Sequence, residues 1–334
     1  MISSKIENGL TGSPSIPGDK SISHRSIIIP SISKGDCEIN NLLKSDDVLH
    51  TLNAFKQMGV KIEDVGETKI KIHGKGLNSL RKPNKEIYLG NSGTSARLLC
   101  GLLASQKFNS IVCGDKSLSK RPMKRISDPL SQMGAIIKTK NGTLPIEIVG
   151  CNLRSCSIDI LIPSAQIKSG VILAALNTPG TTEIIENKIT RDHTEIMLED
   201  FGAEIDITKE ENKKIIQIKG RKELISKNID VPSDLSSSAF FIVAALINEN
   251  SNILLKKINI NPTRTGILIA LKKMGANIKY HNKRMSNNEQ VCDIEVISSS
   301  LNGYDFDPSY ADLMIDEYPI LSIAASFAKS PTIF

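Results

Sequence analysis

The sequence predicts an α/β protein built from repeated helix-and-strand units. A short pattern, methionine or phenylalanine followed by glycine and then valine or alanine, recurs four times. A helix-like stretch precedes each copy and a β-rich run follows it, and a glycine just past an amphipathic stretch is typical of a helix C-terminus. The glycines are 75, 68 and 73 residues apart, which predicts one unit about every 70 residues. They are Gly59, Gly134, Gly202 and Gly275.

The elements can be placed from this period one by one. Small polar residues open a second set of helices, which alternates with the first set and continues into alanine- or isoleucine-rich sequence. Strand-like runs separate the two sets and follow each glycine, so the order indicates βαβ-type units. The glycine-terminated helices are expected at 45–58, 119–133, 190–201 and 262–274, the second set near residues 20, 91, 164, 234 and 316, and strands at 36–42, 110–113, 136–140, 181–185, 203–208 and 253–260.

Length and composition limit the class of protein. The chain has 334 residues, which suggests two domains, and only 4% of them are aromatic, which predicts an aliphatic core without stacking platforms for single-stranded nucleic acid. Because 42 basic residues are offset by 36 acidic ones, the net charge of +6 suits a local anion site better than a DNA-binding surface. The motifs of an NTP-binding P-loop and of a nicotinamide cofactor site do not occur.

The cysteines and the N-terminus predict the cellular compartment. The six cysteines form no CxxC pair, so we expect reduced thiols in the core, with neither a disulfide framework nor a metal. The N-terminal sequence lacks the apolar region of a signal peptide, and the longest apolar runs fall well short of the ~20 residues of a membrane span. We therefore expect a cytoplasmic protein with no membrane and no nucleic-acid partner.

Cationic residues gather at the starts of several predicted helices, in segments 17–25, 114–123, 190–195 and 261–266. A helix N-terminus already carries a partial positive charge, and a further cation there is typical of a bound anion. Helix N-termini that converge on one cleft would form a binding site for strongly anionic ligands. Four other cations are interpreted as solvated surface: Arg125, Lys138, Lys213 and Lys214.

Seven segments, in unbroken order along nearly the whole chain, resemble the 5-enolpyruvylshikimate-3-phosphate synthase family, and most of all its class II bacterial branch. The resemblance implies the two-domain enolpyruvyl transferase fold, an inside-out α/β barrel of repeated βαβαββ units, here with the last repeats missing. It implies a discontinuous first domain at 1–18 plus 233–334, a second domain at 19–232, and crossings near 17–20 and 231–234. The segments are 17–25 (PGDKSISHR), 90–94 (GNSGT), 114–123 (GDKSLSKRPM), 164–169 (SAQIKS), 190–195 (TRDHTE), 261–266 (NPTRTG) and 315–319 (IDEYP).

The resemblance also implies the reaction and its residues. The reaction is transfer of the enolpyruvyl group from phosphoenolpyruvate to the 5-hydroxyl of shikimate 3-phosphate, in chorismate and aromatic amino acid biosynthesis, without metal or organic cofactor. The complete enzyme is expected to be a monomer. Asp316, as general base, and Lys20 are the implied catalytic residues, and Glu317 is expected to cap or stabilise its helix. The residues implied for shikimate 3-phosphate are Lys20, Ser21, Arg25, Ser164, Ala165, Gln166, Arg191 and Asp316, and those for phosphoenolpyruvate are Lys20, Gly93, Arg121 and Gln166.

Two further expectations concern Gly93 and the end of the chain. In the family a glycine at the Gly93 position leaves room for the inhibitor glyphosate, so a complete enzyme is expected to be glyphosate-sensitive. By its own period the chain stops inside a fifth unit, and the resemblance implies roughly 100 further residues. We therefore expect a truncated chain with little turnover alone and with exposed apolar surface. The alternatives are UDP-N-acetylglucosamine enolpyruvyl transferase, which shares the scaffold, and a non-catalytic anion-binding fragment.

Overall fold

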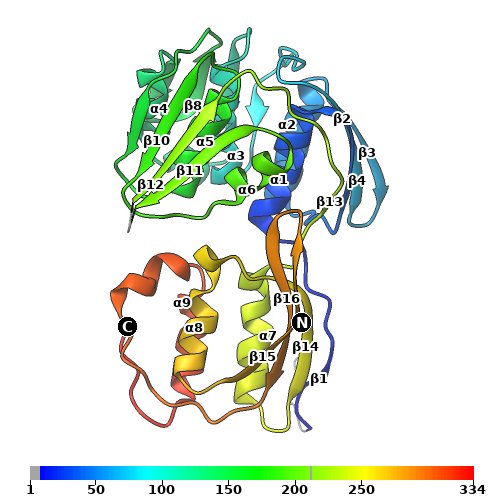
Figure 1. The fold of residues 1–334 in the computed structure, drawn as a ribbon, viewed down its shortest axis with the longest axis vertical. Coiled ribbons are helices and arrows are strands. Elements are labelled where there is room, and N and C mark those ends of the chain that lie inside the picture. Colours follow the sequence, from blue (N-terminus) through cyan, green and yellow to red (C-terminus); the bar gives the residue numbers. More distant parts are fainter. Residues whose placement is uncertain (1–7, 211–212) are drawn as a thin grey trace. The chain divides into compact units, whose positions relative to one another are not determined.

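The computed structural model describes residues 8–210 and 213–334, which belong to two compact units (Figure 1). Lys20–Val231 forms one of them, called here the middle unit. The segments Met1–Asp19 and Pro232–Phe334 together form the other, called here the flanking unit. These limits lie within one residue of the domain limits drawn from the sequence, and the first seven residues of the predicted 1–18 segment lie outside the described residues.

The described part of the middle unit contains three four-stranded sheets that share one topology. In each sheet the first two strands are parallel, and the other two continue it by antiparallel pairing. In the second and third repeats, helices connect the first strand to the second and the second to the following pair, so each reads βαβαββ along the chain. In the first repeat the first strand, β13, comes instead from the end of the unit. The sheet orders are β13-β2-β4-β3, β5-β6-β8-β7 and β9-β10-β12-β11.

The bounds of these elements follow the chain. The first repeat comprises α1 (Lys20–Ser31), β2 (Lys34–Asn40), α2 (Asp46–Gln57), β3 (Lys61–Gly66) and β4 (Lys69–Lys75), together with β13 (Ile229–Asp230). The second comprises β5 (Ile87–Tyr88), α3 (Gly93–Ala104), β6 (Ser110–Cys113), the 3₁₀ turn η1 (Leu118–Lys120), α4 (Lys124–Gln132), β7 (Ile136–Lys140) and β8 (Thr143–Val149). The third comprises β9 (Ser157–Ile160), α5 (Ala165–Ala175), β10 (Thr181–Glu186), α6 (His193–Asp200), β11 (Glu204–Glu210) and β12 (Lys213–Lys219).

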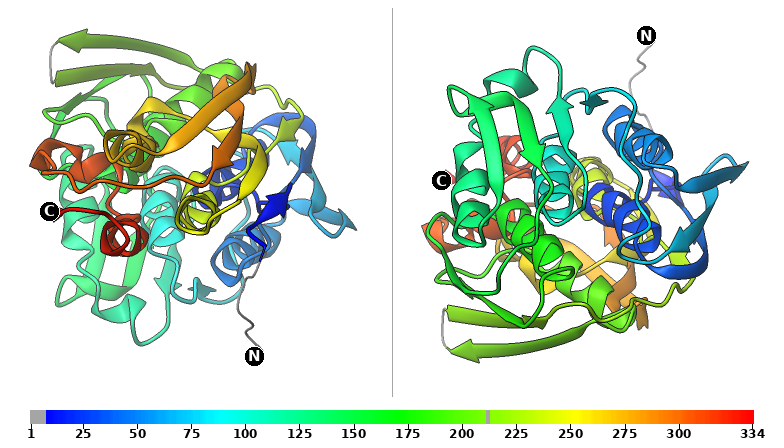
Figure 2. Two further views of the ribbon diagram at one scale, coloured as in Figure 1. Left: turned by 90° about the horizontal axis from the view of Figure 1, so that it is seen from below. Right: turned by 90° about the horizontal axis from the view of Figure 1, so that it is seen from above.

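Helices fill the inside of the middle unit and the sheets cover its outside (Figure 2). The inner helices can be apolar over most of their surface because they are surrounded by protein, and ten of the twelve residues of α1 are buried. Helices α3 and α5 approach closely at two glycines, Gly101 and Gly170. A Cβ on Gly101 would lie 1.7 Å from the carbonyl oxygen of Gly170, so only glycine fits there.

The flanking unit repeats the same plan once and begins it a second time. Its sheet has the order β1-β14-β16-β15, with β1 parallel to β14, and α7 and α8 lie on one face of it (Figure 1). A parallel bridge between Asp305 and Ile333 joins the segment before α9 to the segment after it. The elements are β1 (Thr11–Gly12), α7 (Leu235–Ile247), β14 (Asn252–Asn259), η2 (Pro262–Arg264), α8 (Gly266–Lys273), β15 (Asn277–Ser286), β16 (Glu289–Ile297), η3 (Pro308–Leu313) and α9 (Tyr318–Ser326).

Apolar side chains are exposed at the end of this unit. Ile323 of α9 and the following Phe327 and Phe334 each leave about half of their surface exposed. The ring of Phe334 stacks on Phe306 at a centroid distance of 5.6 Å, which covers only part of it. Among the residues that the structure describes, no helix combines the length and apolar character of a membrane span.

The four repeated glycines end their helices as predicted. Their φ angles are +83° at Gly59, +89° at Gly134, +85° at Gly202 and +92° at Gly275, in the left-handed region that terminates a helix. The starts of three of these helices were predicted too early. Helix α4 begins at Lys124, after η1 and Pro122, α6 begins at His193, and α8 begins at Gly266 after η2.

Candidate functional site

The N-terminus of α1 is tied to α5 and α6 by Arg25. This guanidinium is buried, and its Nε donates to Thr194 Oγ1 at 2.6 Å while Nη2 donates to Ser169 Oγ at 2.8 Å. Its Nη1 donates to the carbonyl oxygen of Ser21 at 2.9 Å, within the first turn of α1. The structure thus places Arg25 and Ser21 together. Lys20 is half exposed and forms an ion pair with Asp47 of α2.

The N-terminus of α5 meets α3 through Gln166. Ser164 caps α5, and its Oγ accepts from the backbone N–H of Ile167 at 3.4 Å. The Gln166 side chain accepts from Arg97 Nη1 at 2.7 Å and donates to Thr94 Oγ1 at 3.0 Å. The first turns of α3 and α5 therefore lie side by side, with the Arg97 guanidinium of α3 bonded to Gln166 of α5.

Two arginines flank Gly93 at the start of α3. A Cβ on Gly93 would lie 2.9 Å from Arg121 Nη1 and 3.0 Å from Arg97 Nη1. Arg121 also donates to Asn91 Oδ1. Burial lowers the pKa of Arg97, and the charges of Arg121 and Arg125 lower it further. Because like charges held this close repel each other, a bound anion would stabilise the pair.

Arg97 is a candidate site residue that was not predicted from the sequence. It lies four residues after Gly93, and positions i and i+4 share one face of a helix. Gly93 was expected to lie close to a ligand. An arginine four residues later on the same helix face is the signal that could have indicated Arg97. Arg125, interpreted as solvated surface, is exposed.

Lys214 is not a surface residue, so this part of the sequence interpretation was wrong. Its side chain is 1% exposed, and its Nζ lies 3.1 Å from Glu195 Oε1. Lys168 of α5 is also buried and forms ion pairs of 2.8 Å with Glu195 Oε1 and with Glu186 Oε2. The two lysines and two glutamates form one buried network beside the segment that carries Arg191.

This network predicts an acid-sensitive contribution to stability. Burial alone would raise the pKa of Glu195, but the charges of Lys168 and Lys214 outweigh burial and lower the pKa to about 2. Because the folded-state pKa is below the ordinary value of 4.5, the contribution is present above pH 4.5 and is lost as the pH falls toward 2. The free energy of unfolding should fall by about 3 kcal/mol over this window through Glu195.

Denaturant titrations of the wild type and of Glu195→Gln at a series of pH values check this. The glutamine has the same shape but does not titrate, so its stability should fall less steeply below pH 4.5. Parallel curves for the two proteins would show that Glu195 does not carry the effect.

Asp316 and Glu317 belong to the flanking unit. Asp316 is exposed, in a turn before α9, and the helix begins at Tyr318 rather than at Asp316. Glu317 occupies the N-cap position of α9 but makes no side-chain cap hydrogen bond, so of its two expected roles the capping one was wrong. Instead its carboxylate is buried and accepts from Ser236 Oγ, which in turn accepts from Arg264 Nη2 at 2.6 Å.

Arg264 shows a second reason for a cation near a helix start. This buried guanidinium pairs with Asp19 and lies 3.6 Å from Asp234 Oδ1. Burial alone would lower the pKa of Arg264, but Asp19, Asp234 and the acidic residues before α9 raise it. The sequence predicted a bound anion at the helix start that carries Arg264. In the structure, the anions beside Arg264 are carboxylates of the protein itself.

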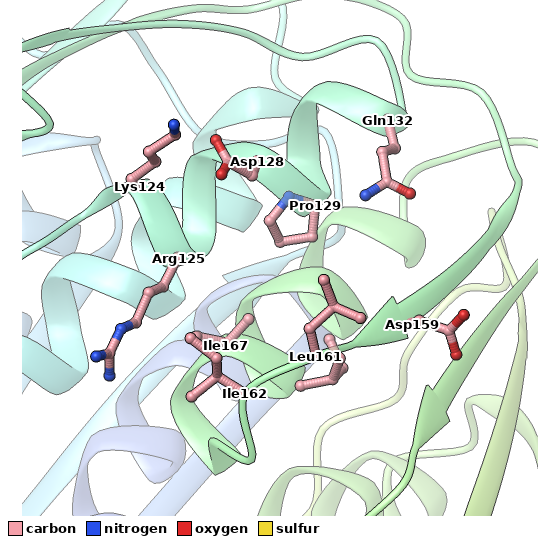
Figure 3. Close-up of a pocket in the computed structure, with 10 residues that line it drawn as sticks. Lys124, Arg125, Asp128, Pro129, Gln132, Asp159, Leu161, Ile162 and Ile167 are labelled. Atoms are coloured by element: carbon pink, nitrogen blue, oxygen red, sulfur yellow. The ribbon is translucent and has the colours of Figure 1, made fainter.

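A separate cavity of about 320 Å³ lies between α4 and the end of β9. Figure 3 shows Leu161, Ile162 and Ile167 on one side of it and Pro129 of α4 on the other, with Arg125 and Asp159 at its edges. None of the residues predicted for the site lines this cavity. The candidate site is therefore defined by side-chain contacts around the helix N-termini.

The structure connects most of the predicted residues of the middle unit through these contacts. One group joins Ser21 and Arg25 to α5 and α6, and the other joins Gln166 to Arg97, which lies with Arg121 beside Gly93. Asp316 is described only with the flanking unit. A two-unit α/β fold with arginines grouped at the helix N-termini of its middle unit is typical of a protein that binds small anionic ligands.

Comparison with known proteins identifies the family. The family model described as EPSP synthase (3-phosphoshikimate 1-carboxyvinyltransferase) matches residues 5–334, and the chain belongs to this family. It is 49% identical over 330 residues to the 3-phosphoshikimate 1-carboxyvinyltransferase of Ruthia magnifica subsp. Calyptogena magnifica, covering 98% of this chain and 75% of that protein. It is 45% identical over 334 residues to the enzyme of the same name from Magnetococcus marinus, covering 99% of this chain and 74% of that one.

A solved structure agrees with the fold. EPSP synthase from Acinetobacter baumannii is 45% identical and superposes with a TM-score of 0.90, over 97% of this chain and 73% of that chain. The enolpyruvyl transferase fold predicted from the sequence motifs is therefore confirmed, and so is the family.

Proposed function

We propose that this chain is a 3-phosphoshikimate 1-carboxyvinyltransferase, which transfers the enolpyruvyl group of phosphoenolpyruvate to the 5-hydroxyl of shikimate 3-phosphate and releases phosphate. The observation that carries the proposal is the 43–49% identity to relatives of this name over nearly the whole chain. The arginines at the helix N-termini of the middle unit supply a physical reason, because both substrates are anions.

The 3-phosphate of shikimate 3-phosphate is assigned to the start of α5. Ser164 supplies a hydroxyl and Ala165 an adjacent amide at a positively polarised helix end. Arg191 adds a guanidinium, which binds a phosphate in a two-pronged geometry that lysine lacks. Ser21 and Arg25 hold the same substrate from α1, where Arg25 is already fixed by Ser169 and Thr194.

Phosphoenolpyruvate is assigned to the pair Arg97 and Arg121. Both guanidiniums lie next to Gly93, and Gln166 contacts Arg97, so a ligand bound there can touch α3 and α5 together. Lys20 contacts both substrates in this proposal. Asp316 accepts the proton of the 5-hydroxyl as general base, which raises the nucleophilicity of that oxygen. The enzyme works as a cytoplasmic monomer without a cofactor.

A binding experiment tests this function and its nearest alternative. Isothermal titration with shikimate 3-phosphate should show binding, and UDP-N-acetylglucosamine should neither bind nor displace it. Arg191→Ala should weaken shikimate 3-phosphate about 100-fold, because a charge-assisted contact to phosphate is lost. Arg154→Ala, which removes an exposed arginine of the same unit, is the matched control and should bind as the wild type does. Binding of the nucleotide sugar in place of shikimate 3-phosphate would overturn the assignment.

Glyphosate sensitivity depends on the space at Gly93. In Gly93→Ala the new methyl would press on Arg97 and Arg121, whose flexible ends must shift by a few tenths of an ångström. We expect glyphosate, added with saturating shikimate 3-phosphate, to bind the wild type, and to bind the alanine variant at least about 10-fold more weakly. Titration calorimetry measures both, and equal affinities would contradict the role of Gly93.

A further inference from the structure

Two buried lysines contact the chain neighbours of Arg191, one at the backbone carbonyl of Thr190 and the other at the side-chain carboxylate of Asp192. Lys168 Nζ donates to the carbonyl oxygen of Thr190 at 3.3 Å and pairs with Glu186 and Glu195 at 2.8 Å each. Lys214 Nζ lies 3.1 Å from Glu195 Oε1 and 3.7 Å from Asp192 Oδ2. Thr190 and Asp192 are the two chain neighbours of Arg191.

The carboxylates complete this clamp. Glu186, at the end of β10, accepts from Thr190 Oγ1 as well as from Lys168, so Thr190 is held through both its side chain and its carbonyl. Glu195 Oε1 is shared by Lys168 and Lys214, which links the contacts on the two sides of Arg191. The whole connection runs from α5 through β10 and α6 to β12.

Burying four charges is an expensive way to stabilise a fold. A well-packed apolar cluster of the same volume often stabilises as much or more, so a buried ion network is weak evidence for stability alone. The position of this buried ion network suggests a role other than stability. Lys168 lies on α5 four residues after the cap Ser164, and its backbone N–H bonds to the Ser164 carbonyl oxygen at 3.0 Å. The same residue therefore joins the N-terminus of α5 to the Arg191 segment.

We propose that Lys168 is a positioning residue for substrate phosphate: with Lys214 and the shared Glu195, it presets the Thr190–Asp192 backbone so that Arg191 and the first turn of α5 bind one phosphate together. This proposal rests on the proposed function, since it takes Arg191 as the phosphate-binding arginine. Ordering the arginine before binding removes part of the entropy cost that binding would otherwise carry.

A double-mutant cycle tests the proposal. The proteins are the wild type, Lys168→Met, Arg191→Ala and the double variant, each titrated with shikimate 3-phosphate and with shikimate, which lacks the phosphate. Lys168→Met should weaken shikimate 3-phosphate about 10-fold and shikimate less than about twofold. In the Arg191→Ala background the same substitution should change shikimate 3-phosphate affinity by less than about twofold, because there is no arginine left to position.

The controls separate the possible failures. Circular dichroism must show each protein folded at the titration temperature. Because Lys168→Met leaves two buried carboxylates with less compensation, Thr190→Val is the milder second variant. It removes only the hydroxyl bonded to Glu186, and should weaken shikimate 3-phosphate about threefold, again only when Arg191 is present. Additive losses in both cycles, or equal losses for shikimate, would overturn the positioning role. A wild type that does not bind shikimate 3-phosphate would instead overturn the proposed function.

Discussion

Gly101→Ala is expected to prevent stable folding of the middle unit. The added Cβ would lie 1.7 Å from the carbonyl oxygen of Gly170 and 2.5 Å from its carbonyl carbon, so the clash is with backbone that cannot rotate away. Helices α3 and α5 would have to separate, and their separation would open the core between two repeats. The cost should be at least about 3 kcal/mol. Denaturant unfolding followed by circular dichroism measures it.

A matched substitution isolates the clash from the general effect of adding a methyl group. Gly66 at the end of β3 lies on the surface, and a Cβ there would meet only Lys69 Cβ at an ordinary 3.5 Å. Gly66→Ala should change the free energy of unfolding by less than about 1 kcal/mol. If Gly101→Ala proved as harmless as Gly66→Ala, the close approach of α3 and α5 would be contradicted.

Arg97→Ala is expected to cause the largest loss of phosphoenolpyruvate affinity. The substitution removes one of the two guanidiniums beside Gly93 and leaves the Gln166 side-chain oxygen without its Arg97 donor. With shikimate 3-phosphate saturating, phosphoenolpyruvate should bind 30- to 100-fold more weakly, which corresponds to about 2–3 kcal/mol for a charge-assisted contact. Arg97→Lys should recover only part of the loss, because an ammonium cannot bind a carboxylate or phosphate with two parallel hydrogen bonds.

Arg125 is the matched control for the Arg97 substitution. Its charge lowers the pKa of Arg97, but its own side chain is exposed. Arg125→Ala removes the same charge from the same neighbourhood, and should weaken phosphoenolpyruvate less than about threefold. Equal losses for the two variants would mean that only the general positive field matters, and that the contact beside Gly93 does not.

The repeat was predictable because it depends on local signals. A helix must be ended, and glycine in the left-handed region ends it at low cost, so Gly59, Gly134, Gly202 and Gly275 marked the period correctly. The helix starts were less certain. The 3₁₀ turns η1 and η2 begin near the predicted starts of two helices, and these short turns look like helix in sequence because they use the same capping residues.

The burial of Lys214 was missed although its sequence carried a signal. Residues alternate between the two faces of a strand, and Lys214, Ile216 and Ile218 of β12 share the buried face. A lysine in register with two core isoleucines indicates a buried, paired charge. Its pairing with Glu195 could not be predicted, because it depends on how α6 packs on the sheet.

The partners of Arg264 show where sequence reasoning ends. The segment around Arg264 resembles the other cationic helix starts, yet its carboxylate partners, Asp19 and Asp234, come from positions 245 and 30 residues earlier in the chain. Only the fold of the flanking unit brings them together. A cation at a helix start therefore does not by itself indicate a ligand, because at Arg264 the same pattern belongs to an internal ion pair.

A crystal structure of the chain with bound shikimate 3-phosphate tests the account most directly. It shows whether the helix N-termini and arginines of the middle unit bind this substrate. The phosphate should lie within hydrogen-bonding distance of the Ser164 hydroxyl and the Arg191 guanidinium, with the ring beside Ser21 and Arg25. Electron density for the ligand elsewhere, for example in the cavity between Pro129 and Leu161, with Ser164 and Arg191 untouched, would contradict the account.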